Sequence, residues 1–259
     1  MLHRLEDRIA IVTGAESGIG AATALALAAE GCAVAINYHT DRETAAAVRA
    51  GALRLGVRAI IIEADVADEA SVAAMFTACE NELGSCNILV SNAGVNAKTV
   101  SVADMPVEEW DKTIATNLRG AFLCARAFVR ARRGKSGPGR IVMVSSIHED
   151  VAVPGWSDYD ASKAGLLAFT KTLALEVAPL GITANAVAPG MILTAMNAEA
   201  QADPNVLEEK TAHVPLHRAG TAEEIAAAIV FLCTEAAGYI TGTSLRIDGG
   251  LSLMAGQGA

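Results

Sequence analysis

The 259-residue sequence has no long uninterrupted apolar stretch. Its longest run without an ionisable side chain, residues 177–198, contains Pro179, Gly181, Pro189 and Gly190, which would break a membrane-spanning helix. The first residues, MLHRLEDRIA, lack the continuous apolar core of a signal peptide. We therefore expect a cytoplasmic protein that does not associate with membranes.

Basic residues are scarce. The chain has 20 Lys and Arg residues against 29 Asp and Glu residues, which gives a formal net charge of −9. Nucleic acid would be repelled by such a surface. The one dense basic run, within residues 126–140, straddles a predicted helix end and is interpreted as a solvated helix terminus. No nucleic-acid partner is expected.

Cysteine pairs and metal-ligand clusters are also missing from the sequence. The cysteines are Cys32, Cys79, Cys86, Cys124 and Cys233. They are odd in number and widely scattered, and they form neither a Cys-x-x-Cys pair nor a Cys/His cluster at metal-ligand spacing. We expect reduced thiols and no metal.

Short β-rich runs alternate with longer helical patterns along almost the whole chain. The predicted strands are Ile9–Val12, Ala33–Tyr38, Ala59–Glu63, Ile88–Ser91, Arg140–Ser145, Thr183–Ala188 and Ser244–Ile247. The helical patterns lie near 18–30, 41–55, 68–83, 106–133, 157–179 and 221–234. Most of the strands are continuously apolar, as is typical of parallel strands covered on both faces. The alternation predicts an α/β fold: one Rossmann-like domain over 1–259, with a doubly wound parallel sheet of about seven strands and helices on both faces.

A glycine-rich loop follows the first predicted strand and leads into the first helix. Gly14 can make the tight exit from the strand, Gly18 can let the backbone approach a pyrophosphate, and Gly20 can let the helix pack close to the sheet. An ordinary turn could contain such glycines, but their place in a βαβ unit favours a dinucleotide site. The predicted contacts in this loop are Gly14, Ser17, Gly18, Ile19 and Gly20.

The end of the second predicted strand bears on the choice between NAD and NADP. A carboxylate there would bind the ribose 2′-hydroxyl and repel a 2′-phosphate, but this chain has Asn37, followed by Tyr38 and His39. His39 or Arg42 could pair with a 2′-phosphate, although Arg42 could equally cap an exposed helix. Glu16 in the phosphate loop counts against NADP. These residues favour NADP or dual use.

Tyr159 and Lys163 lie four residues apart in a helical pattern and therefore on one helix face. A phenol with a pKa near ~10 exchanges protons poorly at neutral pH, and a nearby ammonium should lower that pKa. Ser145 and Ser146 end the fifth predicted strand and should enter the same crevice. A Tyr-x-x-x-Lys pattern taken alone is more often a surface pair.

Several such features occur together in one order. They are Thr-Gly-x-x-x-Gly-Ile-Gly at 13–20, Asp65-Val66, Ser91-Asn92-Ala93-Gly94, Asn117, Ser146, Tyr159-x-x-x-Lys163 and Pro189-Gly190. Over essentially its whole length the chain thereby resembles the short-chain dehydrogenase/reductase family. Ser91 stands where that family usually has Asn, a conservative difference.

The resemblance implies a role for each catalytic residue. Tyr159 would be the general acid/base, and Ser146 would orient the reacting oxygen. Lys163 would lower the pKa of Tyr159 and hold the nicotinamide ribose, and Asn117 would position a water in a proton relay behind Lys163.

The resemblance also implies the remaining cofactor contacts. Asp65 and Val66 would contact the adenine, and Thr194 would bind the carboxamide. Along the rest of the cofactor path lie Asn92, Ala93, Gly94, Pro189, Gly190 and Ile192.

Within the family, the segment Ser145–Glu149 and the C-terminal third look most similar to bacterial glucose 1-dehydrogenases, and much of this is shared with 3-oxoacyl-[acyl-carrier-protein] reductases. Asn96 stands where the glucose enzymes have Glu, which weakens the glucose assignment. His148 could reach a substrate hydroxyl or could face water. Trp156 and Met191 are candidates for an apolar wall. The candidate substrate contacts are Asn96, Ser146, His148, Trp156, Tyr159 and Met191.

The leading hypothesis is an NAD(P)-dependent oxidoreductase acting on a sugar or polyol, with a substrate lid around 195–215. The alternatives are a 3-oxoacyl-[acyl-carrier-protein] reductase or another ketoreductase and, from a different class, a non-catalytic NAD(P)-binding regulator. The resemblance further implies a homotetramer built through the helices near 106–133 and 157–179 and the C-terminal segment.

Overall fold

A seven-stranded parallel sheet forms the centre of the molecule. The computed structural model describes residues 5–96, 98–194 and 203–254, and within them the strand order is β3-β2-β1-β4-β5-β6-β7. The strands are β1 Ile9–Val12, β2 Ala33–Tyr38, β3 Ala59–Glu63, β4 Ile88–Ser91, β5 Gly139–Val144, β6 Ile182–Pro189 and β7 Ser244–Ile247. Every neighbouring pair is parallel. The predicted doubly wound sheet of about seven strands is confirmed.

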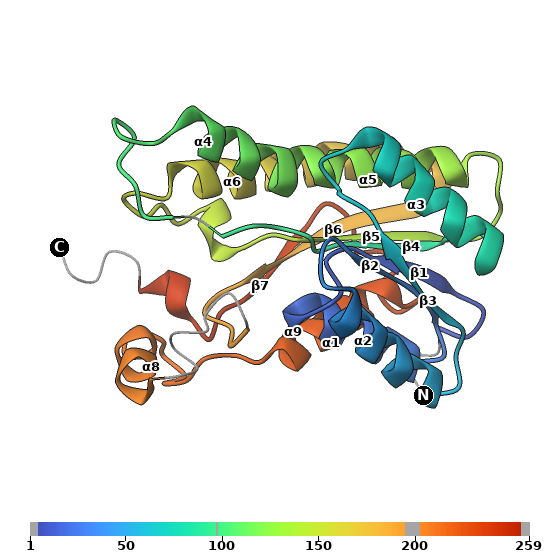
Figure 1. Ribbon diagram of the computed structural model, residues 1–259, viewed down its shortest axis with the longest axis horizontal. Helices are drawn as coiled ribbons and strands as arrows, with labels where there is room; N and C mark the ends of the chain where they lie inside the picture. Colours follow the sequence, from blue (N-terminus) through green and yellow to red (C-terminus); the bar gives the residue numbers. More distant parts are fainter. Residues whose placement is uncertain (1–4, 97, 195–202, 255–259) are drawn as a thin grey trace.

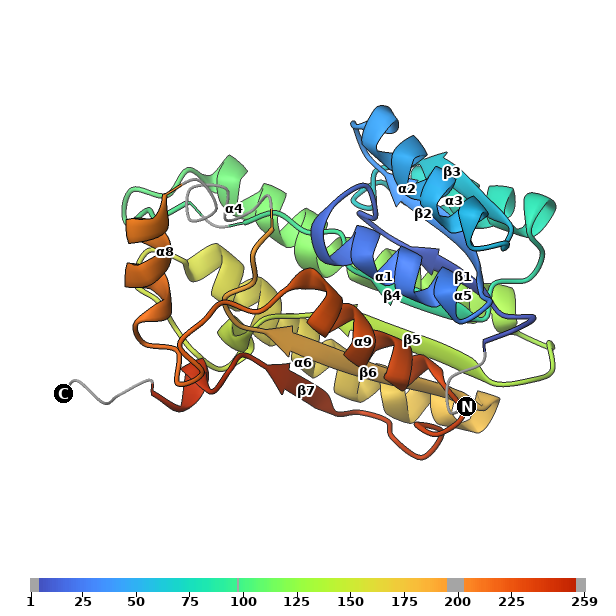
Figure 2. The same ribbon diagram turned by 90° about the horizontal axis from the view of Figure 1, so that it is seen from below.

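Helices cover both faces of this sheet. They are α1 Gly18–Ala29, α2 Arg42–Arg54, α3 Glu69–Glu82, α4 Val107–Ile114, α5 Gly120–Arg132, α6 Ser157–Val177, α8 Pro204–Thr211 and α9 Ala222–Cys233. Figure 1 shows α3, α4, α5 and α6 on one face and α1, α2 and α9 on the other. The view from below shows α8 away from the sheet (Figure 2).

Each face of the sheet has its own apolar core. Leu27 and Ile229 belong to the core beneath α1 and α9, and Phe128 and Leu166 belong to the core beneath α5 and α6. Strand β1 serves both cores, because successive side chains of a strand point to opposite faces. This two-sided burial explains why the central strands are continuously apolar. Among the described residues, every helix is too short or too polar to span a lipid bilayer.

The chain reverses its strand order between β1 and β4. It runs outward through β2 and β3 and then returns to place β4 on the other side of β1. Loops that leave the carboxyl ends of β1 and β4 therefore diverge and open a crevice between them, which is where ligands bind in sheets of this kind. The predicted site residues that follow strands lie at this end.

The helical pattern predicted over 106–133 is interrupted by a π-helix. Between α4 and α5, the segment η1, Ala115–Arg119, has wider turns. A side chain at Gly120 would meet Val66, whose Cγ2 lies 2.9 Å from the position a Cβ would take. The helix therefore passes close to the β3–α3 loop.

The segment predicted as a lid contains a helix that the sequence analysis did not predict. The Asp203 side chain accepts a hydrogen bond from Asn205 N and so caps the start of α8. Residues 195–202 lie outside the described part of the chain, so the lid remains a prediction there.

Candidate active site

The glycine-rich loop leaves β1 in the predicted conformation. Gly14 and Gly18 have φ angles of 57° and 54°, in the left-handed region that glycine adopts without strain. A Cβ on Gly20 would lie 2.2 Å from Gly14 O, so only glycine fits there. Ser17 precedes α1 without a side-chain cap, which leaves the first N–H groups of the helix available to an anion. The loop therefore fits a pyrophosphate.

A second loop is fixed against the first by hydrogen bonds. Thr13 Oγ1 accepts from Asn92 N at 2.9 Å and from Ala93 N at 3.0 Å. The Asn92 side chain donates in return to Thr13 O and Gly14 O, both at 2.9 Å. Asn92 and Ala93 thus set the distance between the ends of β1 and β4. Thr13 begins the motif at 13–20, but the motif alone predicts no role for its hydroxyl.

A cavity of about 360 Å³ follows β2 and β3 on the adenosine side of the crevice. Its lining includes predicted cofactor contacts, namely Gly14, Asn37, His39, Asp65, Val66, Ala93 and Gly94. Glu16 also lines it, and Glu16 Oε2 is buried with no hydrogen-bond partner among the described residues. The lining of this cavity therefore includes an imidazole, from His39, and a carboxylate, from Glu16.

Three residues at the end of β2 differ from one another in what they contact. Asn37 is buried and braces the site: its Oδ1 accepts from Gly14 N at 3.1 Å, and its Nδ2 donates to Ala64 O at 3.0 Å. Tyr38 is buried and its hydroxyl donates to Glu63 at 3.3 Å, so it does not line the cavity. His39 does line it, and Arg42 does not.

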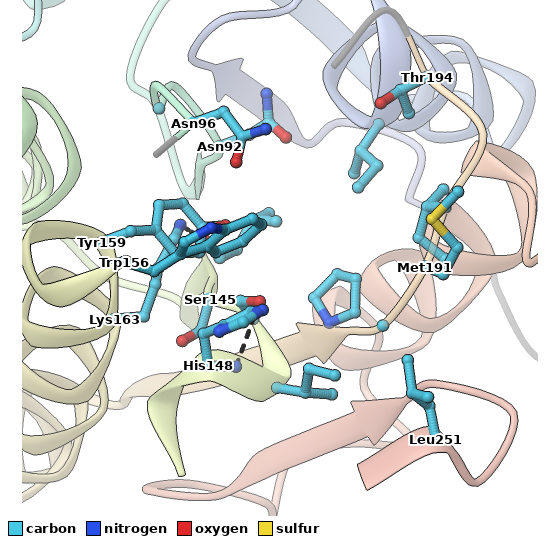
Figure 3. A pocket seen from close by; sticks show the side chains of 18 of the residues that line it. Asn92, Asn96, Ser145, His148, Trp156, Tyr159, Lys163, Met191, Thr194 and Leu251 are labelled. Carbon is cyan, nitrogen blue, oxygen red and sulfur yellow. Dashed lines mark hydrogen bonds between the residues drawn. The ribbon is translucent and has the colours of Figure 1, made fainter. Parts of the chain in front are cut away.

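A second cavity, of about 290 Å³, opens beyond β5 and β6. The predicted site residues in its lining are Ile19, Asn92, Gly94, Asn96, Ser146, His148, Trp156, Tyr159, Lys163, Pro189, Gly190, Met191, Ile192 and Thr194. Figure 3 shows Tyr159, Trp156 and His148 on one side of this cavity, and Met191 and Thr194 on the other. The structure thus brings together predicted site residues up to 175 positions apart, from Ile19 to Thr194.

Tyr159, Ser146 and Lys163 form the predicted catalytic group. Tyr159 and Lys163 share one face of α6, and Lys163 Nζ lies 5.4 Å from the centroid of the Tyr159 ring. Ser146 follows β5 and is hydrogen-bonded to the Tyr159 hydroxyl. Lys163 Nζ donates to Val144 O at 3.0 Å. The phenol, the serine hydroxyl and the ammonium therefore converge at one wall of the cavity.

The electrostatics of this group correct one expectation. Burial raises the pKa of Tyr159, a hydrogen bond from Ser146 opposes that rise, and the charge of Asp160 adds to it. Lys163 is not among the causes of this pKa shift; its Nζ lies 5.4 Å from the centroid of the Tyr159 ring and donates to Val144 O. Burial lowers the pKa of Lys163 to about 8, and the negative charge of Glu149 opposes this shift.

The π-helix η1 carries Asn117 into the space between the β4 loop and α6. Its Oδ1 accepts from Val95 N at 2.8 Å, and its Nδ2 donates to Val95 O at 3.0 Å and to Ser162 Oγ at 3.2 Å. Ser162 Oγ in turn donates to Tyr159 O at 2.7 Å. Asn117 therefore ties the β4 loop to the helix that carries Tyr159. Its part in a water relay stays a prediction.

Other lining residues come from segments in which the sequence gives no functional signal. Lys210 reaches the catalytic cavity from α8, and Leu251 from the 3₁₀ turn Leu251–Leu253. Thr194 packs against the phosphate loop, because its Cβ lies 3.3 Å from the position a Cβ on Gly18 would take. No spacing rule connects Lys210 or Leu251 to the motifs, since only the tertiary fold places these two residues at the cavity.

Comparison with known proteins extends the resemblance to the whole chain. A family model described as Enoyl-(Acyl carrier protein) reductase matches residues 14–252. The chain is 39% identical over 256 residues to 3beta-hydroxysteroid dehydrogenase 1 of Eggerthella lenta, covering 99% of this chain and 98% of that protein. It is 41% identical over 248 residues to a 3-oxoacyl-[acyl-carrier-protein] reductase of Synechocystis, covering 95% and 98%.

A solved structure agrees with these relatives. A putative short-chain alcohol dehydrogenase from Sinorhizobium meliloti superposes with a TM-score of 0.91 at 39% identity, covering 97% of this chain and 98% of that one. The fold and the site together define an oxidoreductase that acts on alcohol and carbonyl groups. The chain belongs to the short-chain dehydrogenase/reductase family, whose members use NAD or NADP.

Proposed function

We propose that this enzyme oxidises an alcohol carbon of a sugar or polyol, or reduces the corresponding carbonyl, with Tyr159 as general acid/base. The observation that carries the proposal is the convergence of Tyr159, Ser146 and Lys163 on a cavity of about 290 Å³ that also exposes the polar side chains of Asn96 and His148. A hydroxylated substrate needs such partners, because an unmatched buried hydroxyl costs about 1–3 kcal/mol.

The residues present fit a dinucleotide. The loop at Gly14, Gly18 and Gly20 would hold the pyrophosphate, the cavity beside Asp65 would take the adenosine, and Thr194 would meet the carboxamide. When bound, the nicotinamide supplies hydride to a carbonyl carbon or accepts it from an alcohol carbon.

The chain's own residues account for the proton. In the reductive direction the Tyr159 hydroxyl donates its proton to the carbonyl oxygen, and in the oxidative direction the phenolate removes it from the alcohol. Ser146 positions that oxygen by a second hydrogen bond. Lys163, buried and with a pKa of about 8, supplies positive charge near the phenol. We further propose that Asn117 links this group to a water and so to solvent.

We propose that both NAD and NADP bind. The end of β2 has no carboxylate to repel a 2′-phosphate, and His39 lines the cavity where that group would lie. Glu16 faces the same cavity and limits any preference for NADP, because its negative charge opposes the phosphate. Fluorescence titration of the enzyme with NADH and NADPH measures the two affinities directly.

A second candidate substrate is a 3-oxoacyl thioester. It is favoured by 41% identity to the Synechocystis 3-oxoacyl-[acyl-carrier-protein] reductase over 98% of that protein. A non-catalytic regulator is disfavoured, since pure cofactor binding would not require Asn117, Ser146, Tyr159 and Lys163 together.

The deciding experiment is a substrate panel assayed at the NAD(P)H absorbance with both cofactors. Sugars, polyols, secondary alcohols and acetoacetyl thioesters are compared by kcat/KM. Turnover of sugars or polyols above the thioester supports the proposal, and preferential turnover of the thioester replaces it with the second candidate. Cofactor binding without turnover of any member would instead support the regulator.

We also propose a cytoplasmic homotetramer. Helices α5 and α6 carry exposed apolar side chains on their outer face: Phe122 is 41% exposed and Leu175 is 80% exposed. Phe122 packs edge-on against Phe169, with centroids 6.0 Å apart, beside a groove between the two helices. Burial of this face against a second copy would remove apolar surface from water. Sedimentation equilibrium measures the assembly, and a monomer would contradict it.

A further inference from the structure

An aspartate and a histidine are paired at the edge of the catalytic cavity, outside the proton-transfer group. Asp160 follows Tyr159 in α6, and His148 lies in the 3₁₀ turn η2, Ile147–Glu149. His148 Nδ1 and Asp160 Oδ1 are 2.9 Å apart, and the two side chains are only 13% and 16% exposed. His148 is one of the predicted substrate contacts, whereas no sequence motif points to Asp160.

The imidazole is fixed on several sides. The second oxygen of Asp160 accepts from Val153 N at 2.9 Å, which anchors the carboxylate. The His148 ring stacks on Trp156, with centroids 4.8 Å apart and planes at 25°. It meets the Tyr159 ring edge-on at 5.6 Å. Figure 3 shows the ring at the cavity wall on the same side as Tyr159.

The pairing determines which ring nitrogen carries the proton. A carboxylate can only accept a hydrogen bond, so the proton of a neutral imidazole resides on Nδ1, between the ring and Asp160. The lone pair then lies on Nε2. This is the ring nitrogen that Asp160 leaves available, and His148 lines the cavity. The site therefore offers a fixed acceptor close to the proton-transfer group, because His148 N also donates to Ser146 Oγ at 3.3 Å.

We propose that His148, oriented by Asp160, accepts a hydrogen bond from a hydroxyl on the carbon next to the reacting carbon, and that the enzyme thereby selects 1,2-diols and α-hydroxy carbonyl compounds. The proposal rests on the proposed function and specifies its substrate class. Asp160 is a positioning residue that acts through His148. A substrate with only hydrogen at that carbon gives Nε2 no hydrogen-bond donor. A substrate with a second carbonyl there places a carbonyl oxygen, which is an acceptor, opposite Nε2, which is also an acceptor.

The test compares three four-carbon ketones that differ only at that carbon. They are 3-hydroxy-2-butanone, 2-butanone and 2,3-butanedione, each assayed for kcat/KM with NADH and with NADPH. The unaltered enzyme should prefer the hydroxy ketone. His148→Ala should lower the ratio of hydroxy ketone to 2-butanone about tenfold, the factor expected for one hydrogen bond.

Asp160→Asn gives a sharper result than removal of the side chain. The amide oxygen can still accept from Val153 N, while the amide NH₂ now donates to His148 Nδ1 and moves the ring proton to Nε2. The ring then presents a donor to the cavity, so the ratio of hydroxy ketone to diketone should fall about 5- to 10-fold. The loss of charge near Tyr159 affects proton transfer to all three ketones alike and cancels in the ratios.

Asp150→Asn is the matched control. Asp150 directly follows η2 and pairs with Arg246 at 2.5 Å, and it does not line the catalytic cavity. This variant should leave both ratios unchanged. If His148→Ala and Asp160→Asn change kcat/KM for all three ketones by one common factor, the two residues are only structural and the inference is overturned. If the enzyme turns over other panel members but none of these ketones, the inference about His148 is overturned and the proposed function stands. If it turns over no panel member at all, the proposed function is overturned as well.

Discussion

The two halves of the crevice are built differently. In the cofactor half, main-chain groups at the ends of β1, β2 and β4 are tied together by Thr13, Asn37 and Asn92. In the substrate half, side chains from α6, α8, η2 and the segment after β6 meet around a cavity. A backbone-built site depends on glycines at set spacings, and a side-chain-built site depends on which segments the fold brings together. The first leaves its glycine motif in the sequence. The second leaves the Tyr159-x-x-x-Lys163 pattern, but Lys210 and Leu251, which also line its cavity, leave none.

The largest expected effect is a loss of turnover caused by a change in the substrate half alone. Tyr159→Phe removes the hydroxyl that exchanges the proton but keeps the ring that packs against His148 and Trp156. The kcat for the best panel substrate should fall about 10²–10⁴-fold, as general acid/base groups contribute. The Kd for NADH, measured by fluorescence titration, should not change. Retained turnover would remove Tyr159 from the mechanism.

The next largest expected effect is a loss of cofactor affinity caused by a change in the cofactor half. In Gly20→Ala the new methyl group would lie 2.2 Å from Gly14 O, so the loop must shift. We expect at least a tenfold loss of NADH affinity and a loss of about 1–3 kcal/mol in the free energy of unfolding. Gly56→Ala is the control for affinity, because its φ of +86° also makes alanine destabilising while Gly56 lines neither cavity. Equal effects of both variants on affinity would contradict the assigned role of Gly20.

A pH experiment addresses the lysine that sits where the two halves meet. Burial lowers the pKa of Lys163 to about 8 in the folded protein, against about 10.4 for a free side chain. At pH values between these two pKa values, the Lys163 side chain binds more protons in the unfolded chain than in the folded protein. This group therefore makes the cofactor-free protein more stable as pH rises from 8 to 10. Urea titrations across this range should show a smaller rise in Lys163→Met. An identical slope in the variant would contradict the depressed pKa.

The smallest expected effect is a change in the ratio of NADPH affinity to NADH affinity within the cofactor half. Glu16→Gln removes the carboxylate that faces the adenosine cavity without changing its size. Binding of NADPH should improve relative to NADH by about 2- to 5-fold, the range of a weak charge interaction near the surface. Glu63→Gln, which alters the partner of Tyr38 away from the cavity, should leave the ratio unchanged. A ratio that does not move in Glu16→Gln would show that Glu16 plays no part in cofactor choice.

Sequence periodicity was sufficient for most of the strands, because burial on both faces makes the central strands continuous apolar runs. The predicted Ala33–Tyr38 is the strand observed. It was insufficient for η1, since a π-helix has no periodic signature of its own within a continuous helical pattern. The position of the catalytic residues followed from motif order. The electrostatics of Lys163 did not, because burial and the bond to Val144 O depend on the packed structure. Asp160 was missed for the same reason: its partner lies twelve positions away on another element.

The hydrogen bonds of Asn37 at the end of β2 limit which substitutions there could change the coenzyme preference. Asn37 Nδ2 faces the carbonyl oxygens of Tyr38, Ile62 and Ala64. An aspartate at this position would confront those three acceptors with another acceptor and loosen the joint between neighbouring strands. Replacement of Asn37 by aspartate would therefore weaken the joint between β2 and β3 at the same time as it favoured NAD. His39 lines the cavity and takes no part in these three hydrogen bonds.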